Sequence, residues 1–375
     1  MSMKNVTRRD AIKLFGFVGT SAVTVAAMSG CSGSNAGKEG SSNESAAPAS
    51  SASQGQAAAK ADVKTTAGTV TANVDLTQYE AGKVVRLWLN VPQDYEYQKV
   101  GDVKFDAPGA ETAQVNTDDD GNQMLYAEWG ADADPSTRTC SLSFHVNREE
   151  CVRPELVETG DVPDDIKPYL EGSTLVPVNQ QVVDAANQIV GDKNTVLDKA
   201  KAIYDWIVAN MNRDESVQGC GQGDVCALLS TRSGKCTDIN SVFVGLCRAV
   251  DIPARELFGV RMNADDVTTA QHCWAEFYLP GTGWVSADPA DVLKAVLKNN
   301  WSKDQQETKD KADYYWGGLD SERVQLSFGR EVTLSPAQDG PALNYFGYPY
   351  AEVGGDALDY YDPKNFVYTI SFAKD

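Results

Sequence analysis

A thiol, an imidazole and a carboxylate follow one another along a single segment of the chain. Cys236 lies in a Gly-Lys-Cys-Thr-Asp run (234–238), His272 opens a His-Cys-Trp-Ala-Glu run (272–276), and Asp288 precedes a proline. In a thiol nucleophile triad, an imidazole activates the thiol and a carboxylate orients the imidazole. The chain has only two histidines, so there is only one alternative to His272 for the imidazole. Cys236, His272 and Asp288 are therefore our candidate catalytic residues.

The residues after Cys236 predict a helix that begins at the thiol. Apolar residues recur at steps of three and four between 239 and 250, which is the pattern of one face of an α-helix. A thiol attacks carbonyls as the thiolate, so its pKa must fall below the free value of about 8.5. A helix N-terminus and a neighbouring imidazolium both favour the thiolate. We therefore expect Cys236 at a helix N-terminus, with a lowered pKa.

His272 and Asp288 are predicted to lie on two strands of one hairpin. Residues 272–279 alternate as in a strand, turn residues follow, and 284–288 form a second short strand. Opposed residues of an antiparallel pair share a face, so Asp288 reaches the face of His272 only if the loop has odd length or a bulge intervenes. A loop of four would place Asp288 opposite Ala275 and break the triad. We predict an odd loop or a bulge.

Other residues near these motifs carry weaker predictions. The backbone amide of Cys236 is the natural oxyanion donor, and we name the Gln222 side chain as a second. Asp238 and Arg255 are predicted to form an ion pair beside the nucleophile helix, and Glu276 to be salt-bridged rather than catalytic. Three tryptophans could line a substrate groove, but their spacing favours a place in the core: Trp206, Trp274 and Trp284.

Several separate blocks carry a family resemblance. They are the helical segment 199–207, the run 234–238, Leu-Cys-Arg-Ala (246–249) with Ile-Pro-Ala-Arg (252–255), the run 272–276, and Gly-Trp (283–284) with Asp-Pro (288–289). In this order, residues 183–292 resemble the transglutaminase-like superfamily, which has a papain-type thiol enzyme core. The resemblance implies a triad of Cys236, His272 and Asp288, and an α+β fold with the nucleophile helix packed on an antiparallel sheet. Asp251 departs from the family's usual glycine, but aspartate tolerates the left-handed backbone of a helix end.

The N-terminal residues predict export. Residues 7–14 resemble a twin-arginine signal, and the apolar stretch 14–28 is too short for a membrane span. Met-Ser-Gly-Cys (28–31) resembles a lipobox, which implies a lipid on Cys31; the alternative is an ordinary secretory cleavage site. We therefore expect a signal peptide (1–30), a disordered Ser/Ala/Gly-rich tether (31–62), and a protein anchored to the outer face of the bacterial cytoplasmic membrane, in the cell envelope.

Three folded regions are expected after the tether. Alternating residues broken by turns predict a β-sandwich-like domain over 63–158, whose opening also resembles the N-terminal domain that often precedes this core in bacterial members. The catalytic core is expected over 175–300. The aromatic-rich segment 301–375 is predicted to be an extension that packs on the core, although its aromatics could instead frame a cleft.

Composition narrows the function further. With 42% hydrophobic residues over 375 positions, the chain can build two modest domains. Residues 1–30 carry four cations and one anion, so their removal takes the net charge from −20 to −23, which repels nucleic acid. An oxidising compartment would permit the pairs Cys140–Cys151 and Cys220–Cys226. Two histidines and the absence of a CxxC pair do not suit a zinc site, so we expect no metal and no cofactor.

Three functions are consistent with these residues. The first is hydrolysis of peptide or amide bonds, with an acyl-enzyme on Cys236 and a protein or cell-wall peptide as substrate. The second is acyl transfer from glutamine side chains to an amine, which shares the first half-reaction. The third is a non-catalytic binding module of the envelope. We favour hydrolysis because water is the default acceptor at an exposed site and nothing marks an amine pocket.

Overall fold

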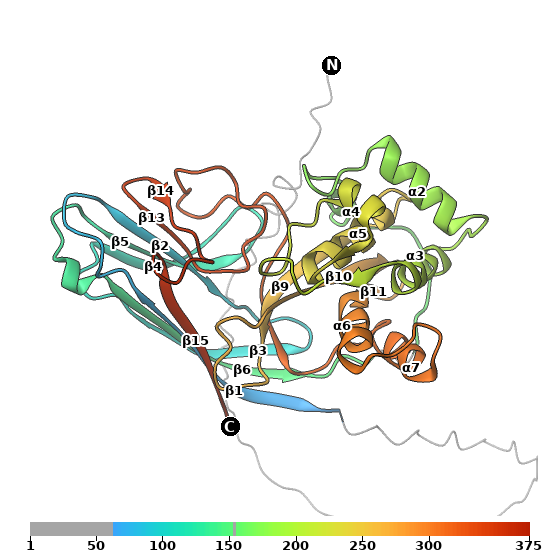
Figure 1. The fold of residues 1–375 in the computed structure, drawn as a ribbon, viewed down its shortest axis with the longest axis horizontal. Helices are drawn as coiled ribbons and strands as arrows, with labels where there is room; N and C mark the ends of the chain where they lie inside the picture. Colours follow the sequence, from blue (N-terminus) through green and yellow to red (C-terminus); the bar gives the residue numbers. More distant parts are fainter. Residues whose placement is uncertain (1–62, 153–154) are drawn as a thin grey trace, which may run out of the picture.

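The computed structural model describes residues 63–152 and 155–375, which form two lobes: a sheet-rich lobe and a lobe of mixed helices and strands (Figure 1). The predicted signal peptide, the tether and Cys31 lie outside these described residues. Within the described ranges, no helix combines the length and apolar character that a membrane crossing requires.

The first lobe is a sandwich of two antiparallel sheets. One sheet has the order β15-β1-β6-β3 and the other β14-β13-β2-β5-β4. Their bounds are β1 Thr65–Asp75, β2 Val85–Val91, β3 Gln98–Asp106, β4 Thr112–Thr117, β5 Gln123–Trp129, β6 Thr139–Glu149, β13 Tyr350–Val353, β14 Asp356–Ala357 and β15 Val367–Lys374. Alternate residues of β6, such as Leu142 and Phe144, are buried and pack with Leu87 and Leu125 of the facing sheet. This alternation is the source of the period-two pattern in the sequence.

The second lobe places helices on a four-stranded antiparallel sheet of order β11-β10-β9-β12. Its strands are β9 Ala254–Arg261, β10 Gln271–Leu279, β11 Gly283–Ala287 and β12 Arg323–Phe328, and its helices are α2 Gln180–Val190, α3 Val196–Asn210, α4 Val225–Thr231, α5 Cys236–Arg248, α6 Pro289–Asn299 and α7 Gln306–Tyr314. The remaining short elements are β7 Asn212–Arg213 and β8 Ser233–Gly234, which pair in parallel, and the 3-10 turns η1 Pro135–Thr137 and η2 Lys167–Leu170. The fold is therefore α+β, with a sandwich preceding a helix-on-sheet core, as predicted.

Helix α5 is the centre of the second lobe. It lies against β10 and β9 on one side, and α2, α3 and α4 cover the other, so every one of its residues is buried. At its C-terminus Asp251 has φ 64°, and the Ile252 N–H donates to the Cys247 carbonyl at 2.9 Å. This is the left-handed helix end that we expected aspartate to tolerate.

The C-terminal segment contributes to both lobes, which is more than the predicted extension packed on the core. β12 joins the core sheet beside β9, whereas β13 and β15 add to the two sheets of the sandwich by pairing with β2 and β1. The sandwich core also takes in Val260 of β9 and Val324 of β12. The core of the sandwich thus extends onto the sheet that holds His272.

Candidate active site

Cys236 occupies the first helical position of α5, with Lys235 as the N-cap residue. The chain enters the helix closely: a Cβ on Gly234 would lie 2.4 Å from the Cβ of Asp238, so only glycine fits there. The Cys236 residue is 3% exposed, and its thiol donates to the Cys220 carbonyl at 3.9 Å. The predicted position of the thiol at a helix N-terminus is confirmed.

Asp238 binds the loop before the nucleophile helix. It does not form the predicted ion pair with Arg255, so that prediction is wrong. Its carboxylate accepts hydrogen bonds from the backbone N–H groups of Lys235 (2.9 Å), Gln222 (3.0 Å) and Gly223 (2.8 Å). Orphan N–H groups at a helix start are strong donors to a carboxylate, which explains why Asp238 satisfies these rather than a distant arginine. Arg255 instead pairs with Glu276 at 2.7 Å, so the prediction of a salt-bridged Glu276 is confirmed.

The hairpin that carries the imidazole and the carboxylate has a loop of three residues. Leu279 pairs with Gly283 and Ala275 pairs with Ala287. Continuing this register places Asp288 opposite Trp274, which shares a face with His272. The odd loop length required for the triad is therefore present.

His272 and Asp288 meet in the interior of the protein. His272 Nε2 lies 2.7 Å from Asp288 Oδ2, and both residues are buried. This contact uses Nε2 of the ring, and His272 also interacts with Cys236, where it contributes to the lowered pKa of the thiol. The ring of Trp274 lies 6.3 Å from the imidazole ring at an interplanar angle of 24°, which limits its rotation. The structure thus brings Cys236, His272 and Asp288 together, and their catalytic role stays a prediction.

Asp288 owes its orientation to its place at the start of α6. As the N-cap residue of that helix, it accepts the Asp291 N–H at 3.1 Å through Oδ1. The same oxygen lies 3.4 Å from Asn240 Nδ2, one turn along α5 from Cys236. Oδ2 is thereby turned toward the imidazole. A helix cap with this geometry fixes the carboxylate before any substrate arrives.

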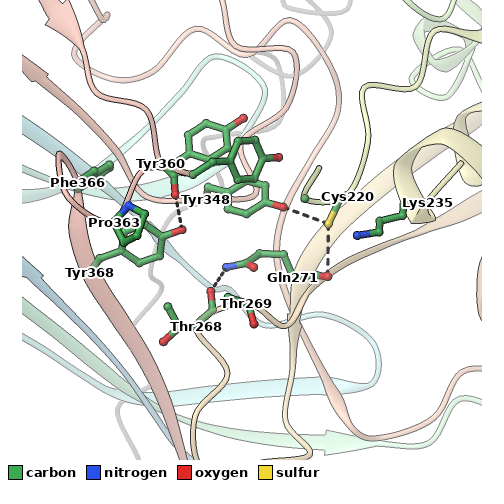
Figure 2. Close-up of a pocket in the computed structure, with 12 residues that line it drawn as sticks. Cys220, Lys235, Thr268, Thr269, Gln271, Tyr348, Tyr360, Pro363, Phe366 and Tyr368 are labelled. Atoms are coloured by element: carbon green, nitrogen blue, oxygen red, sulfur yellow. Dashed lines mark hydrogen bonds between the residues drawn. The ribbon is translucent and has the colours of Figure 1, made fainter. Parts of the chain in front are cut away.

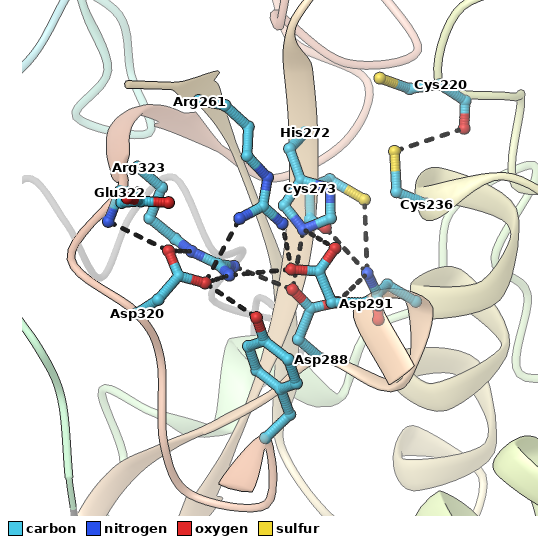
Figure 3. A network of polar contacts seen from close by, with 12 residues as sticks. Cys220, Cys236, Arg261, His272, Cys273, Asp288, Asp291, Asp320, Glu322 and Arg323 are labelled. Carbon is cyan, nitrogen blue, oxygen red and sulfur yellow. Dashed lines mark hydrogen bonds and ion pairs between the residues drawn. The ribbon is translucent and has the colours of Figure 1, made fainter. Parts of the chain in front are cut away.

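The sequence did not predict the ionic residues that surround this contact. Arg323 Nη1 lies 2.8 Å from Asp288 Oδ2, and Arg323 Nη2 lies 3.1 Å from Asp291 Oδ2. Arg261 also pairs with Asp291, and Arg323 with Asp320. We call this set the charge cluster (Figure 3): Arg261, His272, Asp288, Asp291, Asp320 and Arg323.

The electrostatics of the charge cluster favour a protonated imidazole. Burial and Arg261 lower the pKa of His272, but Asp288 and Asp291 outweigh them, so the net effect is a raised pKa. Three carboxylates against two guanidinium groups leave one negative charge, which an imidazolium neutralises. Asp291 remains ionised because Arg261, His272 and Arg323 lower its pKa more than burial raises it.

The pKa of the Cys236 thiol shifts in the opposite direction to that of His272. Hydrogen bonds with Cys220 and Cys273, followed by the contact with His272, hold the pKa of Cys236 well below its usual value despite burial. By contrast, burial holds the pKa values of Cys247 and Cys273 well above the usual value of a thiol. Among these thiols, Cys236 is therefore the one suited to act as a thiolate.

A metal site could be suspected within the charge cluster. A ring nitrogen of His272 and carboxylate oxygens of Asp288 and Asp291 lie close enough together to bind one ion. However, the two carboxylates already accept from Arg323, and Asp291 also accepts from Arg261. A divalent cation there would face two buried guanidinium groups. The donor set therefore suits paired arginines better than a metal.

The predicted disulfide pairs are absent from the described residues, where all cysteines are free. Cys140 lies at the start of β6 and Cys151 beyond its end, and an extended strand of that length separates its ends by about 30 Å or more. Cys220 instead contacts the Tyr348 hydroxyl at 3.3 Å, and Cys226 accepts from Asn179 at 3.3 Å. Both predicted pairs are therefore wrong in this structure.

The remaining sequence-based candidates have clear positions. Gln222 is exposed, and its side-chain oxygen accepts from Asn344 at 3.3 Å, so its proposed oxyanion role stays a prediction. Trp274 is in the core, as expected. Trp284 is partly buried and stacks on Arg255, 4.1 Å from the guanidinium carbon. The second histidine, His145, lies in β6 and pairs with Asp375 at 3.0 Å, in the sandwich.

A cleft of about 450 Å³ lies beside the nucleophile. Cys220 and Lys235 line one end (Figure 2). Lys235 precedes Cys236 in the sequence, and the Cys220 carbonyl accepts from the Cys236 thiol. The other wall comes from the C-terminal segment: Tyr348, Tyr360, Tyr361, Pro363, Phe366 and Tyr368. Some of the aromatics of that segment therefore frame a cleft, the alternative that the sequence favoured less.

Comparisons with known proteins agree with this architecture. The family model described as the transglutaminase-like superfamily matches residues 183–289. An uncharacterized protein of Haemophilus influenzae is 36% identical over 310 residues, covering 75% of this chain and 84% of that relative. The chain belongs to the transglutaminase-like superfamily.

Two solved structures are similar to it. One, from Cytophaga hutchinsonii, is described as a candidate cysteine protease; it is 20% identical, with 83% of this chain and 98% of that chain covered and a TM-score of 0.49. The other is the periplasmic domain of TgpA from Pseudomonas aeruginosa, 16% identical, with 65% and 92% covered and a TM-score of 0.36. At these identities and scores, neither likeness says anything about the activity of this chain.

Proposed function

We propose that this protein is a cell-envelope thiol enzyme that hydrolyses peptide or amide bonds through Cys236, His272 and Asp288. The observation that carries the proposal is the combination at one point of a thiol at a helix N-terminus and an imidazole held by a buried carboxylate at 2.7 Å. The opposite pKa shifts of Cys236 and His272 support a thiolate–imidazolium pair.

The first half-reaction forms an acyl-enzyme. The Cys236 thiolate attacks the carbonyl carbon, and the carbonyl oxygen takes up the negative charge. The backbone N–H of Cys236 is our candidate donor to this oxyanion, because the first N–H groups of a helix have no partner within it. His272 Nδ1 then gives its proton to the leaving amine as the C–N bond breaks, and Asp288 keeps the ring oriented throughout.

The second half-reaction releases the product. His272, now neutral, takes a proton from water through Nδ1, and the hydroxide attacks the thioester carbon. The C–S bond breaks, Cys236 leaves as the thiolate and the carboxylic acid departs. An amine in place of water would give transamidation by the same steps, so the triad serves both reactions. We favour water because the lining of the cleft includes no acidic side chain that would hold an ammonium group.

The location in the envelope rests on residues 1–62, which lie outside the described residues. The twin-arginine-like run and the lipobox-like run ending at Cys31 support export and a lipid anchor. Fractionation of cells that express the Cys31→Ala variant checks this: we expect the protein to leave the membrane fraction, and full retention there would contradict the anchor.

Mass spectrometry of a mixed protein and cell-wall peptide library tests the activity. Residues 32–375 are incubated with the library in reducing buffer that contains a labelled primary amine, with the Cys236→Ala protein as the control. We expect new peptide termini that depend on Cys236. Incorporation of the amine, or deamidation at glutamine, would instead identify a transglutaminase. If no product depended on Cys236, that result would contradict an enzyme of either kind.

A further inference from the structure

The cleft beside Cys236 has an aromatic wall and one charged side chain. Among its lining residues, Lys235 is the single charged one. The remaining lining is made of hydroxyl, amide, thiol and aromatic groups, so a bound molecule meets apolar ring faces with one positive charge at the nucleophile end.

The Lys235 ammonium is held in place and still has donors to offer. Its side chain is only 16% exposed, and its Nζ lies 3.6 Å from Glu215 Oε2. That distance is long for a direct hydrogen bond. The two oxygens of Glu215 already accept from Arg213, at 2.9 and 3.4 Å. The carboxylate nearest to Lys235 is therefore shared with a stronger partner.

The cation lies at the end of the cleft that is nearest to Cys236 in sequence. Lys235 immediately precedes Cys236, and Figure 2 shows Lys235 and Cys220 among the residues that line the cleft. The Cys220 carbonyl accepts the Cys236 thiol, so this end of the cleft adjoins the sulfur. A substrate whose carbonyl reaches Cys236 would place its neighbouring group against Lys235 and the tyrosines.

Charge decides which neighbouring group fits. A basic group would meet the ammonium at short range and be repelled. An apolar group would strip water from the ammonium without replacing it, which costs free energy. A carboxylate would replace that water with a charge-assisted hydrogen bond in a partly buried site. Resting on the proposed function, we propose that this cleft is the acyl-donor subsite and that it selects peptides with a carboxylate beside the scissile amide.

The net charge of the whole protein acts on a different step. A chain with a net charge of −20 repels an acidic peptide at long range and slows its encounter. The contact with Lys235 acts after the encounter, by holding the bound peptide in register. Acidic peptides should therefore bind more tightly in spite of the overall repulsion, and the preference should reside in Lys235.

Binding to the Cys236→Ala protein, in the chain 32–375, tests the subsite without turnover. Fluorescence anisotropy would compare labelled peptides that differ at one residue: glutamate, glutamine or lysine. Two further forms, with a free or an amidated C-terminus, separate a side-chain carboxylate from a terminal one. We expect the acidic peptides to bind about five- to tenfold more tightly than the glutamine peptide, in line with a partly buried charge pair.

Charge reversal at Lys235 provides the sharper test. Adding Lys235→Glu should invert the order, so that the lysine peptide binds best, and Lys235→Gln should remove the preference. Lys193→Glu is the matched control, because Lys193 is exposed in the turn after α2 and the substitution makes the same change in net charge. That control should keep the preference of the parent protein.

The outcomes separate this subsite from the proposed function. Equal binding of all peptides, or an unchanged order in Lys235→Glu, would overturn the subsite while leaving turnover that depends on Cys236 intact. Absence of turnover in the library experiment would overturn the enzyme, whereas a preference that follows residue 235 would still identify the binding site.

Discussion

Replacing Arg323 by methionine should lower the free energy of unfolding by about 3–5 kcal/mol, the usual cost of removing one partner from a buried ion pair. Arg323 is fully buried and contacts Asp288, Asp291 and Asp320. Methionine fills similar space but leaves three carboxylates against Arg261 and His272. Urea denaturation followed by tryptophan fluorescence gives the measurement.

A matched substitution separates the charge cluster from ordinary surface pairs. Lys201→Met removes an ion pair with Asp205 at 2.6 Å, in which Asp205 is exposed and Lys201 is partly exposed. It should cost at most about 0.5 kcal/mol, as exposed pairs on a helix do. If Arg323→Met cost no more than Lys201→Met, the charge cluster would not stabilise the fold.

Replacing His272 by glutamine should reduce kcat/KM by about a hundredfold or more, since general base catalysis supplies about 10²–10⁴. The active pair needs a thiolate and an imidazolium, so it exists between the pKa of Cys236 and that of His272. Because the pKa of Cys236 is lowered and that of His272 is raised, the range of pH in which the wild-type protein works should be wide and should extend above pH 6.5. In the variant, the fall in activity at alkaline pH should disappear. The rise in activity from acidic pH should occur at a higher pH than in the wild-type protein. A pH profile of peptide cleavage gives both results.

His145→Gln is the control for this substitution. His145 lies in β6, partly exposed, and its contact is with Asp375 rather than with the charge cluster. Its loss should leave the pH profile unchanged. Equal loss of activity in both histidine variants would mean that the effect is not specific to the site.

The sequence predicted the elements whose periodicity comes from burial. Helix α5 and strand β10 carry regular patterns because each has a face against the core, and the loop of the hairpin followed from the need to bring Asp288 to the face of His272. The left-handed backbone at Asp251 was expected from the family's usual glycine at this position and from the tolerance of aspartate for that conformation.

The arginine partners within the charge cluster, and the sheets that the C-terminal strands join, could not be predicted from the sequence. Arg261 and Arg323 come from strands far apart in sequence, and a lone arginine in a strand carries no signal of its partner. Asp291 offered one clue, because it lies three residues after Asp288 and so within one turn of the same helix. Which sheet a short C-terminal strand joins depends on tertiary packing rather than on its own residues.

The central claim is that Cys236 is a thiolate activated by His272, and the pH dependence of its alkylation tests this most directly. The folded protein is treated with iodoacetamide over a range of pH, and peptide mapping follows each cysteine. We predict selective modification of Cys236, with a midpoint well below the free thiol value of about 8.5, while Cys247 and Cys273 remain unmodified. A rate for Cys236 that rises only above that value, or modification only after unfolding, would contradict the account.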